Sequence, residues 1–214
     1  MSVYSEQQGD LTMKNIETME HMRSHFKDHK AEIAVDNDRI CVIDFRNKNG
    51  SGEYYVNFII DKQRGMFIVS GDLGESVAMW YNHLSPADVK RYIHDVDYYI
   101  KKIQCSTDLY EYDVDDIAED IADIIYEAGE SAEPEHITIE SHTDEENEWW
   151  NEVVEEIENC IHDDKFYPSE TLHDMIDEVV SDSWEWLWRC GRRINPRVYL
   201  WAVAYQMACE QLGI

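Results

Sequence analysis

The sequence lacks two features that would place the chain in or across a membrane. None of its apolar runs approaches the roughly 18 to 20 residues needed to span a bilayer. The first ten residues, MSVYSEQQGD, contain neither the basic stretch nor the apolar stretch of a signal peptide. We therefore expect a protein of the cytoplasm that has no membrane partner.

Closely spaced cysteines and the common catalytic motifs are also missing. Five scattered cysteines contain no C-x-x-C pair, and they are Cys41, Cys105, Cys160, Cys190 and Cys209. Such a set favours reduced, mostly buried thiols over disulfides or a zinc site. The motifs G-x-S-x-G, Walker A, G-x-G-x-x-G and H-E-x-x-H do not occur. We expect no catalytic residue, no cofactor and no metal.

The third shortage is of basic residues, and it is confined to one stretch. Residues 105–182 hold 28 Asp and Glu but only one basic residue, Lys165, a balance of −27 out of −28 for the whole chain. The balance is −3 for residues 1–104 and +2 for residues 183–214. Because contacts to phosphates need Lys and Arg, this stretch is a poor surface for binding DNA or RNA directly.

Strand-forming residues dominate the first half of the chain. After a helix predicted over residues 12–30, five short segments are rich in β-branched and aromatic residues: IAVD, RICVIDFRN, EYYVNFIID, GMFIVSG and SVAMWYN. NKNGSG and DKQRG between them are typical of hairpin turns. We predict an antiparallel meander of four or five strands.

Helical periodicity takes over at residue 85. Ser85 and Pro86 are typical of a helix start, and we predict one helix from there to Gln104. Three acidic helices are predicted over residues 113–130, 144–162 and 170–190, with a linker at 130–142 in which HITIE could add a short strand. The last helix, residues 196–213, is apolar nearly all round, so we expect it at the centre of the helical part.

These patterns predict an α+β fold, in which an N-terminal helix and a small antiparallel β-sheet precede an acidic α-helical bundle. The composition, 43% hydrophobic and 12% aromatic, suffices for one large domain or two small ones. We divide the chain into an α/β region at 1–104 and an acidic helical region at 105–214, which could also form one continuous domain.

Each acidic helix combines an apolar stripe with a row of carboxylates. Residues 113–130 hold eight acids and no base, while Ile117, Ile121 and Ile125 recur on one side at helical spacing. The acids expected to face outward and bind a partner are Asp116, Glu119, Asp120, Asp123, Glu127, Glu130, Glu145, Glu148, Glu152, Glu155, Glu156, Asp174, Asp177 and Glu178. Like charges one turn apart are destabilising, so the pattern calls for an explanation.

One explanation is that the carboxylate rows imitate a phosphate backbone. A rigid array of anions can occupy a basic groove that evolved for DNA or RNA and releases the same counterions. The alternative is that these are ordinary solvated helix faces, although a surface of mixed sign would have supplied stabilising ion pairs. Aromatic residues lie among the acids at Tyr110, Tyr112, Tyr126, Trp149 and Trp188, and they suit either core packing or interface contacts.

Carboxylates at helical spacing can also hold metal ions. Glu152-x-x-Glu155 and Asp174-x-x-Asp177 resemble the paired motifs with which all-helical nucleotide pyrophosphatases bind Mg²⁺, and such an enzyme is the alternative function. That family uses Glu in most of these places, and its substrate needs basic partners that this stretch lacks. Other groups with suggestive spacing are Glu170-x-x-His173, Glu133-x-x-His136, His162-Asp163-Asp164, and Asp113 with Asp115 and Asp116.

One basic cluster follows the acidic stretch. It consists of Arg192, Arg193 and Arg197, for which we expect contacts with neighbouring acids rather than with a partner. An adaptor or an antitoxin that binds a basic protein would need the same acidic surface as a nucleic-acid mimic, so the sequence leaves that alternative open.

SGEYYVNFIIDKQRGMFIVSGDLGESVAMWYN, residues 51–82, resembles proteins carried by phages and mobile elements of Firmicutes. In its acid-rich helices the chain also resembles in character the anti-CRISPR and anti-restriction inhibitors, several of which are acidic nucleic-acid mimics. The resemblance implies a non-enzymatic inhibitor, acting in the host cytoplasm, whose partner is a Cas nuclease or another nucleic-acid-binding defence effector. It carries no motif from which individual functional residues could be transferred.

Overall fold

The computed structural model describes residues 21–131 and 144–214, and it confirms the α+β class. Contacts divide the chain into two compact units. The sheet unit comprises residues 1–109 and 195–214, and the acidic unit comprises residues 110–194. The acidic unit is therefore an insertion in the sheet unit, and it holds 28 Asp and Glu against four Lys and Arg.

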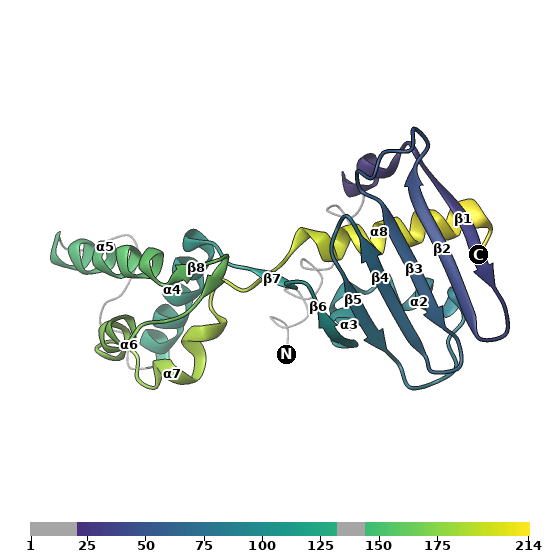
Figure 1. Cartoon of the computed structure of the whole chain (residues 1–214). Coiled ribbons are helices and arrows are strands. Elements are labelled where there is room, and N and C mark those ends of the chain that lie inside the picture. Colours follow the sequence, from purple (N-terminus) through teal and green to yellow (C-terminus); the bar gives the residue numbers. More distant parts are fainter. Residues whose placement is uncertain (1–20, 132–143) are drawn as a thin grey trace. The chain divides into compact units, whose positions relative to one another are not determined.

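The sheet unit is built on six antiparallel strands in sequential order (Figure 1). They are β1 (His29–Asp36), β2 (Ile40–Asn47), β3 (Val56–Asp61), β4 (Met66–Gly71), β5 (Ser76–Met79) and β6 (Ile103–Ser106). The meander is thus confirmed, with one strand more than predicted. The helix predicted over residues 12–30 is corrected at its end: Arg23–Phe26 form a 3-10 turn, η1, and β1 begins at His29, while residues 12–20 lie outside the described part.

Alternation along the strands creates one buried face. Phe58 on β3 and Phe67 on β4 are fully buried, whereas their neighbours Ile59 and Ile68 are only partly covered. The rings of Phe58 and Phe67 each meet the ring of Tyr205 edge-on, with centroids 5.0 Å apart. Aromatic packing of this kind fixes which face of the sheet becomes the core.

Two short helices replace the single helix predicted over residues 85–104. Ser85 and Asp88 form a capping box at the start of α2 (Pro86–Ile93). Asp95 leaves the helical conformation and caps α3 (Val96–Ile100) by accepting the Tyr98 N–H. Because α3 ends at Ile100, the following residues can join the sheet as β6. This strand was not predicted, because its first residue continues the helical periodicity.

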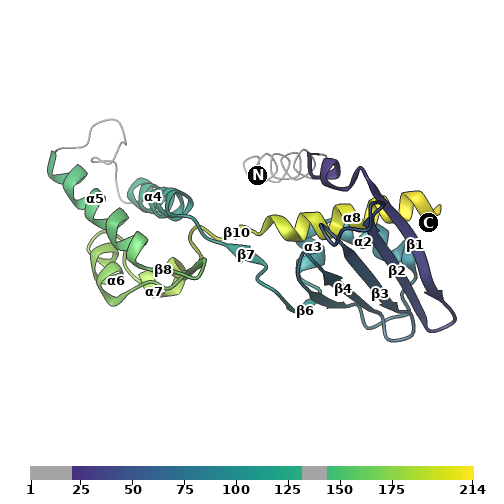
Figure 2. The same ribbon diagram turned by 45° about the horizontal axis from the view of Figure 1, so that its top comes forward.

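The last helix, α8 (Pro196–Leu212), lies against the sheet unit and not at the centre of the acidic helices, so that prediction is wrong. It lies with α2 and α3 on the same side of the sheet (Figures 1 and 2). The Trp201 indole N–H donates to the Leu73 carbonyl at 3.2 Å, and the Tyr205 hydroxyl donates to the Pro86 carbonyl at 2.9 Å. The helix is apolar on several sides because it is covered on several sides.

The acidic unit begins and ends with strands that pair. β7 (Tyr110–Glu111) and β10 (Arg193–Ile194) form a two-stranded antiparallel ribbon. Between them follow α4 (Val114–Ser131), α5 (Asp144–Asn159), the hairpin β8 (Ile161–His162) and β9 (Lys165–Phe166), α6 (Glu170–Asp177), α7 (Ser183–Trp186) and the 3-10 turn η2 (Leu187–Arg189). Residues 132–143, which contain most of the predicted linker and HITIE, lie outside the described part.

A core of its own stabilises the acidic unit. It joins the predicted inner stripes of α4, α5 and α6, and its fully buried members include Ile117, Ile121, Val153, Ile157, Leu172 and Ile176. The helix predicted over residues 170–190 is interrupted after Asp177, and Asp182 adopts a left-handed conformation with φ of 62° before α7. Asp tolerates this conformation better than most residues do, because its short polar side chain can form local hydrogen bonds.

The cysteines agree with the prediction of reduced thiols. All five are free, and only Cys105 is exposed. Across the described ranges, 21–131 and 144–214, no helix combines the length and hydrophobicity that a membrane crossing requires.

Candidate acidic interface

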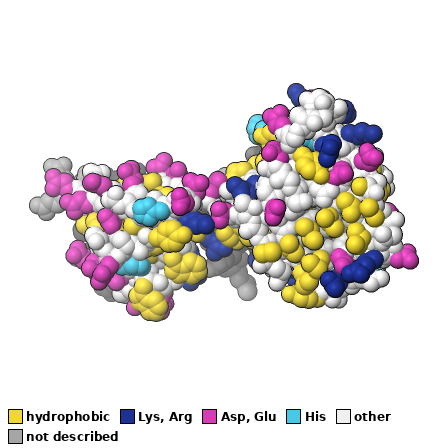
Figure 3. Space-filling view, in the orientation of Figure 1, with side chains coloured by type: hydrophobic (Ala, Val, Ile, Leu, Met, Phe, Trp, Pro, Cys, Tyr) yellow, Lys and Arg dark blue, Asp and Glu magenta, His cyan; other side chains and the backbone are white. Residues whose placement is uncertain are grey.

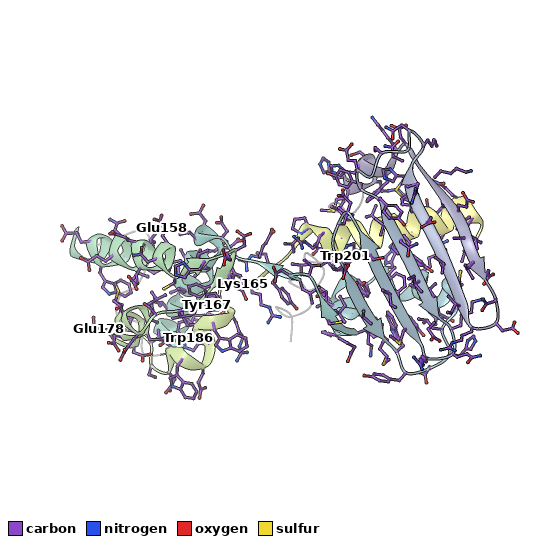
Figure 4. The ribbon with its side chains drawn as sticks, in the orientation of Figure 1. Glu158, Lys165, Tyr167, Glu178, Trp186 and Trp201 are labelled. Atoms are coloured by element: carbon purple, nitrogen blue, oxygen red, sulfur yellow. The ribbon has the colours of Figure 1, made fainter. Side chains whose placement is uncertain are left out.

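Most of the predicted carboxylates point away from the core of the acidic unit. Asp and Glu side chains are spread over this unit on the face shown in Figure 3, and Glu158 on α5 and Glu178 after α6 mark two of its helices in Figure 4. Of the fourteen predicted interface residues, nine are exposed: Glu119, Asp123, Glu127, Glu148, Glu152, Glu155, Asp174, Asp177 and Glu178. Glu130 and Glu145 lie on α4 and α5, but their side chains are outside the described part.

Two acids on α4 are bound by groups inside the unit. Arg193 donates from Nη1 and Nη2 to the two oxygens of Asp120, both at 3.1 Å, and its Nε lies 3.2 Å from Asp116. The Asp120 carboxylate also accepts the N–H of Gly191 at 2.7 Å. Hydrogen bonding to Asp120, followed by the charges of both acids, raises the pKa of Arg193.

The other two predicted acids that are engaged internally belong to α5 and α6. Glu156 accepts the Ser169 hydroxyl at 2.5 Å and thereby ties α5 to the start of α6. Asp177, though exposed, accepts the backbone N–H of Ser183 at 2.8 Å, and this hydrogen bond lowers the pKa of Asp177. These two residues position the helices that carry the exposed acids.

The three arginines of the basic cluster make three different kinds of contact. For Arg193 the expected contact with acids is confirmed. The Arg192 guanidinium lies 3.6 Å from the centroid of the Tyr110 ring, a cation–π contact that secures the β7–β10 ribbon. Arg197 bonds through its backbone N–H and its Nε to Asn195, the residue that caps α8. Within the described residues, both acids that Arg193 holds come from α4.

A shallow pocket interrupts the acidic surface beside α4. It has a volume of about 350 Å³ and is lined by Asp120, Asp123, Ile124, Glu127, Trp186, Arg189 and Cys190. Arg189 also donates to the Glu185 carbonyl at 3.1 Å, and its guanidinium lies 4.9 Å from the Trp188 ring centroid. Burial raises the pKa of the Cys190 thiol to about 12, so this thiol lines the pocket in its neutral form.

Two exposed tryptophans are close in sequence to Trp186 and Arg189, which line this pocket. Trp184 is 65% exposed and Trp188 is 48% exposed, which is unusual for side chains of this size. Trp188 was among the predicted interface aromatics, whereas Trp184 and Trp186 were not, although the alternation W-E-W-L-W is visible in the sequence. Tyr112 and Trp149 pack against the core of the acidic unit, so for them the core role is confirmed.

In the described part of the chain, the paired acidic spacings do not gather into a group of three possible metal ligands. No three side chains of His, Cys, Asp or Glu among those described come together in a way that would hold an ion. This includes Glu152 and Glu155 on α5 and Asp174 and Asp177 on α6, which suggested Mg²⁺ binding. His173 uses its Nδ1 for a 2.8 Å hydrogen bond with the Ser183 hydroxyl.

Comparison with protein families gives a match over most of the chain. The profile of the phage protein family Phage_phiTE_072 matches residues 43–207, which include most of the sheet and the whole acidic unit. No curated protein and no solved structure matches the chain significantly. The match covers more than three quarters of the sequence and agrees with the phage resemblance noted for residues 51–82. The chain therefore belongs to this phage protein family.

Proposed function

We propose that this phage-family protein is a non-enzymatic anti-defence inhibitor, similar in action to anti-CRISPR proteins. Its acidic unit occupies the nucleic-acid groove of a host effector such as a Cas nuclease, in the host cytoplasm. The supporting observation is that α4, α5 and α6 each present exposed carboxylates on one unit whose composition is 28 acids and four bases.

The geometry of a helix allows these carboxylates to substitute for phosphates. Successive turns place side chains about 5.4 Å apart along the axis, while phosphates along one strand of DNA recur with an axial rise of about 3.4 Å per nucleotide. Glu152 and Glu155 lie one turn apart on α5, and Glu119 and Asp123 lie one turn apart on α4. The common core and the Glu156–Ser169 bond hold α5 and α6 in fixed relation, so little ordering is required on binding.

The long-range field of the acidic unit supports the same function. Its excess of negative charge attracts a cationic groove and accelerates encounter at low salt. It also repels DNA and RNA themselves, so the protein acts on the effector and not on the nucleic acid. An adaptor or antitoxin with another basic target would share the attraction, but its binding would not compete with nucleic acid.

Competition with nucleic acid is therefore the decisive measurement. A Cas nuclease is titrated with the protein while its binding of target DNA is followed at increasing salt concentration. We expect DNA to be displaced, with an apparent affinity of the inhibitor that falls steeply as salt rises. Binding without displacement of DNA would favour the adaptor, and no binding to any basic nucleic-acid-binding effector would refute the proposal.

A pair of charge-matched variants isolates the acidic unit. The test variant carries Glu119→Lys, Glu152→Lys, Glu155→Lys and Asp174→Lys, all at exposed positions of α4, α5 and α6. The control variant carries Glu32→Lys, Asp38→Lys, Glu53→Lys and Glu75→Lys, all at exposed positions of the sheet unit. Both change the net charge equally, so only the test variant should lose inhibition. Equal loss in both would show that net charge alone is responsible.

A further inference from the structure

The face of the sheet opposite α8 carries a continuous apolar row. Cross-strand partners align on this face from β1 to β6, in the order Val35, Val42, Ile59, Ile68, Val77 and Cys105. A second row places Ile40, Met66 and Met79 on the same face, with Asp61 between the first two. Solvent-facing strand positions are normally polar when one face of an antiparallel sheet is in water.

Within the described part of the sheet unit, no helix covers this face. α2, α3 and α8 all lie on the other side of the sheet (Figures 1 and 2). In Figure 3, hydrophobic side chains gather over the central strands of the sheet unit on the face turned to the viewer. Val42, Ile59, Ile68 and Val77 are each partly accessible. Contiguous apolar patches of this kind commonly mark interaction sites.

Charged groups around the rows are already paired within the sheet unit. Asp44 accepts hydrogen bonds from the Tyr55 hydroxyl and the Asn57 amide, at 2.9 and 2.6 Å. Lys62 bonds to Asp36 at 2.5 Å, and Arg39 lies 3.7 Å from Asp61. The face therefore has an apolar centre and a balanced rim, meaning a rim on which acidic groups are paired with basic or neutral ones. Such a face suits neither a strongly basic nor a strongly acidic partner.

We propose that the open face is a self-association surface, on which a second copy of the chain docks sheet against sheet. An isologous pairing would match apolar rows with apolar rows and a balanced rim with a balanced rim. Sheets packed in this way lie about 10 Å apart with their side chains interdigitated.

The area of the face is sufficient for such a dimer. Six strands about 4.8 Å apart span roughly 24 to 29 Å, and two to three side-chain rows extend about 14 to 20 Å along the strands. Each copy thus offers roughly 350 to 580 Å², so a dimer would bury about 700 to 1,150 Å², which reaches the lower limit of roughly 1,000 Å² for specific interfaces. We expect a reversible dimer, which presents two acidic units to its target.

Salt separates this proposal from the proposed inhibitory function. Each chain carries a net charge of −28, so two copies repel one another at low ionic strength. Screening by salt should therefore strengthen the dimer, whereas it should weaken binding of the acidic unit to a basic groove. The two associations respond in opposite directions, and either can fail without the other.

Sedimentation equilibrium of the full chain over a range of concentrations and salt tests the dimer. The test variant is Ile59→Thr with Ile68→Thr, which keeps β-branched side chains on β3 and β4 but makes them polar. The control is Ile33→Thr on β1; Ile33 is 41% exposed and pairs with Ile43, whose side chain is in the core beneath α8. Circular dichroism confirms that each variant is folded, and Ile68→Thr alone serves if the double variant is not.

We expect the wild-type dimer to tighten with salt, the double variant to weaken it by at least ~10-fold, and the control to change it by less than ~3-fold. A wild-type chain that is monomeric under all conditions would overturn the proposal. The same conclusion would follow from a dimer that survives both substitutions in a folded variant, or from one that weakens as salt rises.

Discussion

Arg193 holds Asp120 in a bidentate ion pair, which joins the last residues of the inserted unit to the second turn of α4. Both hydrogen bonds measure 3.1 Å, and the Gly191 N–H adds a third bond to the same carboxylate at 2.7 Å. Bidentate pairing to a guanidinium is geometrically specific and stronger than a single neutral hydrogen bond. Asp120 therefore stabilises the acidic unit in addition to contributing charge to its surface.

Asp120→Asn should lower the free energy of unfolding of the acidic unit by about 1–3 kcal/mol, because the buried Gly191 N–H and the guanidinium lose a charged acceptor. Glu119→Gln on the same helix removes the same charge from an exposed position, and should change stability by less than about 0.5 kcal/mol. Hydrogen exchange at the α4 amides measures both. Equal effects of the two substitutions would contradict a specific role for Asp120.

The inserted unit should be removable without unfolding the sheet unit. Its two ends are adjacent, because the Asn195 N–H donates to the Leu109 carbonyl at 2.9 Å and β7 pairs with β10 immediately beyond. Replacing residues 110–194 by a short Gly-Ser linker should leave the spectrum of the β-sheet and the burial of Trp201 unchanged, since domain insertions join at such points. Loss of cooperative unfolding in this variant would show that the units depend on each other.

The sequence predicted the strands well because they carry two local signals, β-branched or aromatic composition and alternation. It failed at α8 and β6 for a reason beyond local pattern. The apolar surface of α8 can be covered equally well by helices or by a sheet, and only the fold decides between them. β6 was concealed because Ile103 continues the helical spacing of Val96 and Ile100, while the Asp95 cap that restarts the helix is a local geometric event.

The candidate interface was predictable in outline but not residue by residue. Helical spacing identified the inner stripes of α4, α5 and α6 correctly. It could not show that Asp120 faces Arg193, because the partner lies 73 positions away in the sequence. The pocket was equally invisible, since it joins α4 to Trp186 and Arg189 across the fold.

Acidification should destabilise the sheet unit through His29. Its ring is buried between Phe26 and Phe45, its Nε2 lies 3.3 Å from the Glu53 carbonyl, and its buried Nδ1 has no partner among the described residues. Burial lowers the pKa of His29 below the ordinary value of 6.5. Below about pH 6.5 the unfolded chain takes up a proton that the folded chain refuses, so stability falls by up to about 1.4 kcal/mol per pH unit until the folded pKa is reached.

The contribution of His29 can be separated from that of the other histidines by substitution. His29→Gln keeps a nitrogen donor for the Glu53 carbonyl but does not titrate, so the fall in stability between pH 7 and pH 5 should become shallower. His83→Gln, at an exposed position, should leave the pH dependence as in the wild type. Hydrogen exchange at amides of β2 and β3 reports the stability, and an unchanged slope in His29→Gln would contradict the assignment.

Gly191 is a position at which even the smallest side chain should be costly. Its φ is +66°, and an added Cβ would lie 2.2 Å from Cγ1 and 2.8 Å from the backbone nitrogen of Ile117 in the core of the acidic unit. Gly213, the C-cap of α8, has a similar φ of +71° but open space around it. Gly213→Ala should therefore cost only the conformational penalty of about 1 kcal/mol, whereas Gly191→Ala should add a steric clash and cost more than ~3 kcal/mol. Because the two substitutions share the backbone conformation, the difference measured by hydrogen exchange in their respective units isolates the close approach of Gly191 to α4, and equal costs would show that this approach is not tight.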